Sequence, residues 1–179
     1  QGSTSVPVLL QEALARRAGE LRDVQIVSGF NITTGEAPFC KPEYKDSFLV
    51  NSIFLCADQR RHVAEGYGSL TPCFLSEVPA LFRSGELPID VAFINCSLPD
   101  ENGYCSYGIG CDISVAAVET ARVVIAQVNE AIPCLYAGCL VHESKIAAAV
   151  RCNVPPIAMQ FGEPTEIEKA IGANVAAEI

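Results

Sequence analysis

The chain contains no tryptophan, one methionine and two histidines among its 179 residues. Positive charge is also scarce, because 12 lysines and arginines are set against 21 acidic residues, which leaves a net charge of −9. A protein that binds nucleic acid needs a basic surface to meet the phosphates. We therefore expect no nucleic-acid partner.

Long apolar runs are absent too, since none approaches the roughly 18 residues that a membrane-spanning helix requires. Residues 1–5 lack the basic region and the apolar stretch of a secretory signal. Both absences predict a cytoplasmic protein without a membrane partner. Half of the residues are hydrophobic, which is enough for one sizeable core in a chain of this length.

Cysteine is abundant, with nine residues, but it forms no CxxC pair and no regular spacing. Zinc and iron–sulfur sites depend on such spacing, so we expect no metal site. Disulfide frameworks are typical of short secreted chains, which this one does not resemble. We therefore interpret the cysteines as free thiols that pack as small hydrophobic side chains.

The hydrophobic pattern alternates between the helix and the strand period. Helices are expected at residues 6–21, 59–65, 77–85, 112–122 and 166–179. Apolar, largely β-branched runs predict strands at 24–30, 51–56, 69–75, 89–96, 123–129 and 147–152, with a long loop over 30–48. Such alternation predicts an α/β fold, a mostly parallel sheet with helices on both faces.

Several side chains are placed to begin these helices. Ser76 precedes the helix at 77–85, and Asp112 stands at the start of the helix at 112–122. Thr165 and Glu168 have the spacing of a capping box for the last helix. That helix reaches Ile179 without a stop signal, so we expect the polypeptide to continue beyond it.

Two of the predicted strands end in polar positions. The strand at 89–96 leads into a Pro-Asp-Glu-Asn-Gly turn, and the strand at 123–129 ends in an asparagine. Ligands of open α/β sheets lie beyond the carboxyl ends of the strands, and small or hydroxyl side chains there can admit and bind a carboxylate or thioester. The alternative is a purely structural turn, which also needs Gly and Asn. We predict that the following residues line a substrate pocket or domain interface: Ser97, Gly103, Tyr104, Ser106 and Asn129.

Residues 97–108 read SLPDENGYCSYG. This stretch resembles the pattern S-x-P-D-x-x-G-Y-C-S-x-G of the acetyl-CoA hydrolase/transferase family, which includes 4-hydroxybutyrate and butyrate:acetate CoA-transferases. Gln127-Val128-Asn129 followed by Ile132-Pro133 is similar to a second family motif, and so are residues 35–43 and 71–92. The resemblance extends over about residues 6–177. It identifies residues 6–179 as an amino-terminal CoA-transferase domain, a fragment whose second domain is absent.

The resemblance implies an enzyme that moves CoA between a short-chain acyl-CoA and a carboxylic acid such as acetate, butyrate or 4-hydroxybutyrate. In this family a glutamate attacks the thioester and forms a glutamyl-CoA intermediate, and the pattern places that glutamate beyond Ile179. CoA and acyl-CoA would be substrates, with no permanently bound cofactor. The expected partners are the carboxyl-terminal half of the same enzyme and further copies in a homo-oligomer. We expect this chain alone to be inactive.

One segment departs from the family pattern. Residues 134–150 read CLYAGCLVHESKIAAAV, so the family's histidine-valine-serine-aspartate segment survives only in part at Val141–Ser144, and Lys145 or Ile146 stands where an acidic residue is usual. If this loop shapes the acyl pocket, the identity of the substrate does not carry over from the family. Two alternatives stay open: an acyl-CoA thioester hydrolase of the same family, and a stand-alone binding domain without catalysis.

Overall fold

The structure is a computed structural model that describes residues 5–29, 36–135, 138–158 and 162–179. Residues 1–4 and part of the loop expected at 30–48 lie outside these ranges. The helices are α1 (Val8–Arg16), α2 (Ala57–Ala64), α3 (Val78–Ser84), α4 (Ser114–Thr120) and α5 (Glu166–Ala176). The strands are β1 (Val24–Ser28), β2 (Phe48–Ser52), β3 (Gly68–Leu70), β4 (Val91–Cys96), β5 (Tyr104–Ser106), β6 (Val123–Asn129), β7 (Leu140–His142) and β8 (Ala148–Cys152).

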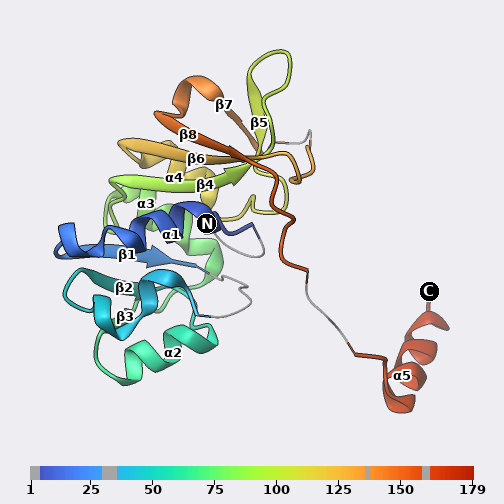
Figure 1. The fold of residues 1–179 in the computed structure, drawn as a ribbon. Helices are drawn as coiled ribbons and strands as arrows, with labels where there is room; N and C mark the ends of the chain where they lie inside the picture. The colour runs from blue at the N-terminus through green and yellow to red at the C-terminus, as the bar shows by residue number, and fades with distance from the viewer. Residues whose placement is uncertain (1–4, 30–35, 136–137, 159–161) are drawn as a thin grey trace.

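The strands form two parallel sheets and one antiparallel pair (Figure 1). The first sheet has the order β1-β2-β3 and the second the order β4-β6-β8, while β5 pairs antiparallel with β7. The predicted α/β class with mostly parallel pairing is confirmed. The parallel strands are divided between two sheets, which the sequence pattern does not reveal.

Alternating side chains of the strands place helices on both faces. Val124 and Ala126 of β6 pack with Val118 of α4 on one face of the second sheet. On the other face, the amide group of Gln127 accepts a hydrogen bond from the backbone of Leu9 in α1. A further cluster joins α3, α4 and the segments that follow β2 and α3; its buried members are Ile53, Val78, Phe82, Leu87, Ile113 and Ala116.

Several local predictions are wrong. The strand expected at 69–75 is limited to β3 at Gly68–Leu70, and Leu75 lies in a 3-10 turn. The strand expected at 51–56 lies earlier, at Phe48–Ser52, because the chain turns at Ile53, whose N–H donates to the carbonyl of Ser28. Ser76 does not cap α3; it lies in a short 3-10 turn, in which the Glu77 carboxylate accepts from the N–H of Phe74. The fourth helix begins at Ser114 rather than Asp112, with no side-chain cap.

The cysteine prediction is wrong for one pair. Cys111, ahead of α4, and Cys139, ahead of β7, form a disulfide with their Cα atoms 5.7 Å apart. A hydrogen bond from the N–H of Tyr107 to the carbonyl of Cys139 brings these two segments together. Cys40, Cys96 and Cys105 are buried and lie outside this disulfide. Among the described residues, no group of three or more His, Cys, Asp and Glu side chains could hold a metal ion.

The last helix stands apart from the rest of the molecule (Figure 1). Its predicted capping box is confirmed, since the hydroxyl of Thr165 accepts from the N–H of Glu168 while the Glu168 carboxylate accepts from the N–H of Thr165. The N–H and the hydroxyl of Thr165 both donate to the Glu168 carboxylate, and these bonds lower the pKa of Glu168. Every residue of α5 is exposed. Within the described ranges, no helix is long and apolar enough to span a membrane.

Candidate functional site

The carboxyl ends of β4 and β6 carry a buried row of amide side chains. Parallel pairing sets Asn95 directly beside Gln127, and the Gln127 side-chain amide donates to Oδ1 of the Asn95 side chain at 3.4 Å. The other end of the Gln127 amide accepts from the N–H of Leu9 at 3.0 Å. This row thus fastens the start of α1 to the strand ends.

Asn129, the last residue of β6, holds two loops at once. Its amide nitrogen donates to the carbonyl of Val154 at 2.8 Å, and its oxygen accepts from the N–H groups of Val154 at 3.0 Å and Ala131 at 3.1 Å. The residue is 1% exposed. Its polar atoms therefore fix the chain that leaves β6 and the chain that leaves β8.

Ser97 and Ser106 lie side by side beyond β4 and in β5. The Ser97 hydroxyl accepts from the N–H of Ser106 at 2.9 Å, and the N–H of Ser97 donates back to the Ser106 carbonyl at 2.8 Å. The Ser106 hydroxyl accepts from the N–H groups of Gly108 and Leu135, both at 3.0 Å, and lies 3.2 Å from the Leu135 carbonyl, to which it donates. Both serines therefore join neighbouring loops.

Gly103 and Tyr104 lie at the more exposed end of this region. Gly103 has a φ of +80°, and a Cβ there would lie 2.9 Å from Nε2 of His142. Tyr104 is 42% exposed and meets the His142 ring edge-on, with ring centroids 5.0 Å apart. The turn is held by Asp100, whose carboxylate accepts from the N–H of Tyr104 at 2.8 Å.

The structure thus brings Ser97 and Ser106 into direct contact and places Gly103 and Tyr104 together against His142. Asn129 ends the strand next to β4 and bonds to neither group in the described hydrogen bonds. Sequence reasoning missed Asn95. The available signal was one amide side chain inside the apolar run of β4, at a position that alternates with the core-facing Ile94 and Cys96.

Two thiols are buried beneath these loops. A hydrogen bond with Cys105 and the burial of the group raise the pKa of the Cys96 thiol. A thiol with a raised pKa stays protonated near neutral pH and is a poor nucleophile. Burial also raises the pKa of the Tyr107 phenol. These groups serve as core side chains, in agreement with the role expected for free cysteines.

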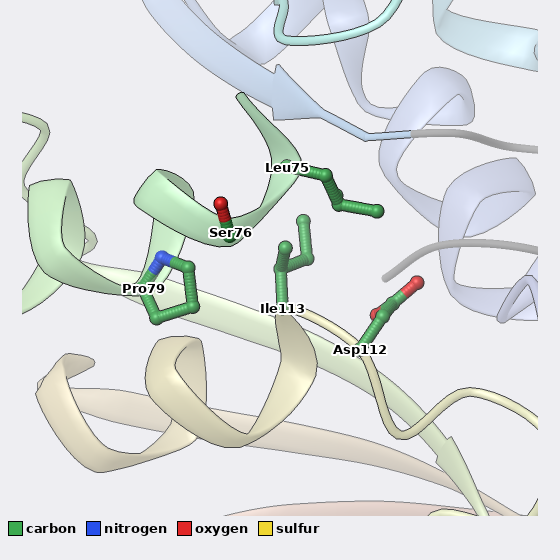
Figure 2. Close-up of a pocket in the computed structure, with 5 residues that line it drawn as sticks. All are labelled: Leu75, Ser76, Pro79, Asp112 and Ile113. Atoms are coloured by element: carbon green, nitrogen blue, oxygen red, sulfur yellow. The ribbon is translucent and has the colours of Figure 1, made fainter. Parts of the chain in front are cut away.

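Two cavities adjoin this part of the molecule. A small one of about 30 Å³ is bordered by the amide row and by residues 154–157 and has the volume of about one water molecule. A larger, open hollow of about 430 Å³ is lined by Leu75, Ser76, Pro79, Asp112 and Ile113 (Figure 2). Its size falls in the range of ligand pockets, and its lining is mainly apolar with one carboxylate.

The fold is that of a parallel α/β domain, a class in which ligands usually bind beyond the carboxyl ends of the strands. The chain belongs to the acetyl-CoA hydrolase/transferase family, because the model of that family's N-terminal domain matches residues 1–151. The predicted family resemblance is confirmed.

Individual relatives agree with this assignment. The chain is 36% identical to the 4-hydroxybutyrate coenzyme A transferase of Clostridium kluyveri, over 97% of this chain and 40% of that protein. It is 32% identical to the succinyl-CoA:acetate/propanoyl-CoA:succinate CoA transferase of Fasciola hepatica, over 98% of this chain and 36% of that one. The chain thus spans about two fifths of the length of these curated relatives.

Solved structures show the same fold. RipA from Yersinia pestis matches with a TM-score of 0.89 at 25% identity, over 98% of this chain and 43% of RipA. The 4-hydroxybutyrate CoA-transferase from Porphyromonas gingivalis matches with a TM-score of 0.75 at 32% identity, over 99% of this chain and 40% of that one.

Proposed function

We propose that this chain is the amino-terminal half of a cytoplasmic CoA-transferase that moves CoA between a short-chain acyl-CoA and a carboxylic acid such as acetate, butyrate or 4-hydroxybutyrate. The observation that carries the proposal is the similarity to CoA-transferases across nearly the whole chain. CoA and its thioesters are substrates here, and the second half of the enzyme completes the site.

The proposed chemistry runs through a glutamate outside residues 1–179. Its carboxylate attacks the acyl carbonyl of the thioester, which releases the CoA thiolate and leaves a mixed anhydride. The thiolate then attacks the glutamyl carbonyl, so that a glutamyl-CoA thioester forms and the first acid departs. The carboxylate of the acceptor acid repeats these steps in reverse and leaves with CoA.

The strand-end edge is this chain's contribution to the proposed site. Gly103 and Tyr104 lie near the surface, where a substrate or the second half can reach them. Ser97, Ser106 and Asn129 lie beneath it and hold the loops that form the surface. Of the five residues, Tyr104 has the exposed polar side chain, and its phenol group can hydrogen-bond a carboxylate or thioester oxygen.

The test uses the complete gene product that contains this sequence, with residues 1–179 alone as the control. Acetyl-CoA and butyrate are supplied, and butyryl-CoA is followed by chromatography. We expect the complete protein to produce butyryl-CoA with a kcat on the order of 1 per second or more, and the control to produce none.

The same assay separates the alternatives. A hydrolase would release free CoA from acetyl-CoA without an acceptor acid, and a binding domain would do neither. The intermediate is tested by mass spectrometry of the enzyme after incubation with acetyl-CoA, which should show CoA bound to a glutamate outside residues 1–179. Transfer by the control chain at the full rate would overturn the proposal.

A further inference from the structure

The last helix of the chain carries an apolar stripe that contacts no other part of the described structure closely enough to be buried. Ile167, Ile171 and Val175 are spaced four residues apart and therefore lie on one face of α5. They are 73%, 57% and 57% exposed. Figure 1 shows α5 well separated from the two sheets, at the end of the segment that leaves β8.

A helix of this length needs a packing partner. Isolated helices shorter than about 12–15 residues are only marginally stable in water, so packing of an apolar face supplies most of the stability of short helices in proteins. The eleven residues of α5 have a capping box and an ion pair between Lys169 and Glu166. Such local interactions contribute only about 1 kcal/mol or less each. We therefore expect another element to pack against the exposed stripe.

The comparison with RipA indicates which element. That match covers 98% of this chain, which leaves about four residues outside it, so it takes in most of the eleven residues of α5. The RipA chain is more than twice as long as the matched part, since only 43% of it is covered. The part of RipA that matches this chain is thus accompanied by a large additional portion of the same polypeptide.

The direction of the strands agrees with an additional portion of polypeptide packed next to α5. In Figure 1 the arrows of β1, β4 and β6 point toward the side on which α5 stands. An additional portion packed against α5 on this side would therefore face the carboxyl ends of the strands. This is the edge that carries Ser97, Tyr104 and Asn129.

We propose that the stripe formed by Ile167, Ile171 and Val175 is the docking surface for the portion of the same polypeptide that follows Ile179, and that this contact holds that portion against the strand-end edge. The inference rests on the proposed function, because it requires the carboxyl-terminal half. It adds the surface by which the two halves are joined.

The test compares two acidic substitutions on α5 in the complete gene product. Ile171→Asp places a charge in the stripe. Ala173→Asp places the same charge about 200° around the helix, away from the stripe, and is the matched control. Ile171→Leu keeps an apolar side chain. Hydrogen exchange of the amides of α5 is the measurement, because exchange reports local opening.

We expect the α5 amides to exchange about tenfold faster or more in Ile171→Asp than in the unchanged protein, with Ala173→Asp and Ile171→Leu close to the unchanged protein. CoA transfer should fall in Ile171→Asp alone. Equal exchange in all four proteins would overturn the docking proposal. So would protection of α5 that depends on protein concentration, together with a change of subunit number in Ile171→Asp, because the occupant would then be a second copy.

These outcomes are separable from the fate of the proposed function. If the unchanged protein transfers CoA but the stripe substitutions alter neither exchange nor activity, the function stands and the docking surface is wrong. If Ile171→Asp exposes α5 in a complete protein that transfers no CoA, the docking surface stands and the transferase proposal fails.

Discussion

The residues predicted to line the strand-end edge fall into two groups, one buried and one exposed. Ser97, Ser106 and Asn129 are at most 4% exposed, and their side chains bond to the backbone of neighbouring loops. Tyr104 is 42% exposed and contacts only the edge of a histidine ring among the described aromatic pairs. The three buried residues therefore determine the shape of the edge, whereas the side chain of Tyr104 is exposed to solvent. The substitutions at Asn129, Gly103 and Tyr104 described below test that division.

The largest loss of stability is expected when the disulfide between Cys111, before α4, and Cys139, before β7, is removed. A cross-link between residues 28 positions apart stabilises by about 3–4 kcal/mol in the chain-entropy model. We expect a variant with Cys111→Ala and Cys139→Ala to lose about this much free energy of unfolding, measured with denaturant. Cys134→Ala, at an exposed free cysteine, is the control. An unchanged midpoint in the double variant would contradict the prediction.

The second largest loss of stability is expected for Asn129→Ala. It removes three hydrogen bonds and leaves the backbone N–H and carbonyl of the half-buried Val154 without their partner, at a cost of about 1–3 kcal/mol. The control is Asn102→Ala in the exposed turn. We expect CoA transfer per folded molecule to be retained. A loss of turnover of about tenfold or more without a loss of stability would instead indicate contact between Asn129 and the substrate.

The sequence patterns that succeeded are local ones. The apolar run at 123–129 coincides with β6, and the spacing of Thr165 and Glu168 predicts the cap of α5, because each depends on residues close together in the chain. The strand expected at 51–56 is misplaced because Ile53, although apolar, does not continue β2. Its side chain packs with Val78 and Phe82 of α3 instead.

The candidate site shows the same limit. Its turn is visible in the sequence, since Asp100 and Gly103 are close neighbours and are residue types that favour such a turn. The hydrogen bonds that decide the role of each residue are not visible. Gln127 bonds to Leu9 across 118 positions, and Ser106 bonds to Leu135 across 29. The disulfide likewise follows from the folded arrangement, because nine irregularly spaced cysteines specify no pairing.

Gly103→Ala should have a smaller effect than Asn129→Ala. A positive φ costs a non-glycine residue about 1–2 kcal/mol, and the new Cβ would also displace the side chains of His142 and Glu143. Gly66→Ala is a matched control, because Gly66 has a φ of +86° and open space around it. We expect both to be destabilised, Gly103→Ala more strongly. Equal losses would show that the contact with His142 carries no cost.

Tyr104→Phe should have the smallest effect on stability and the most specific effect on function. The substitution keeps the ring that meets His142 edge-on and removes only an exposed hydroxyl, so the free energy of unfolding should change by about 0.5 kcal/mol or less. If that hydroxyl hydrogen-bonds a substrate oxygen only in the transition state, kcat and kcat/KM for CoA transfer in the complete enzyme fall together; if it binds substrate and transition state equally, KM rises alone. Tyr44→Phe, at a ring that contacts Phe48 in the first sheet, controls for the loss of a phenol elsewhere. If the kinetics of Tyr104→Phe are unchanged, the hydroxyl is not part of the site, and Tyr104 contributes its ring contact with His142.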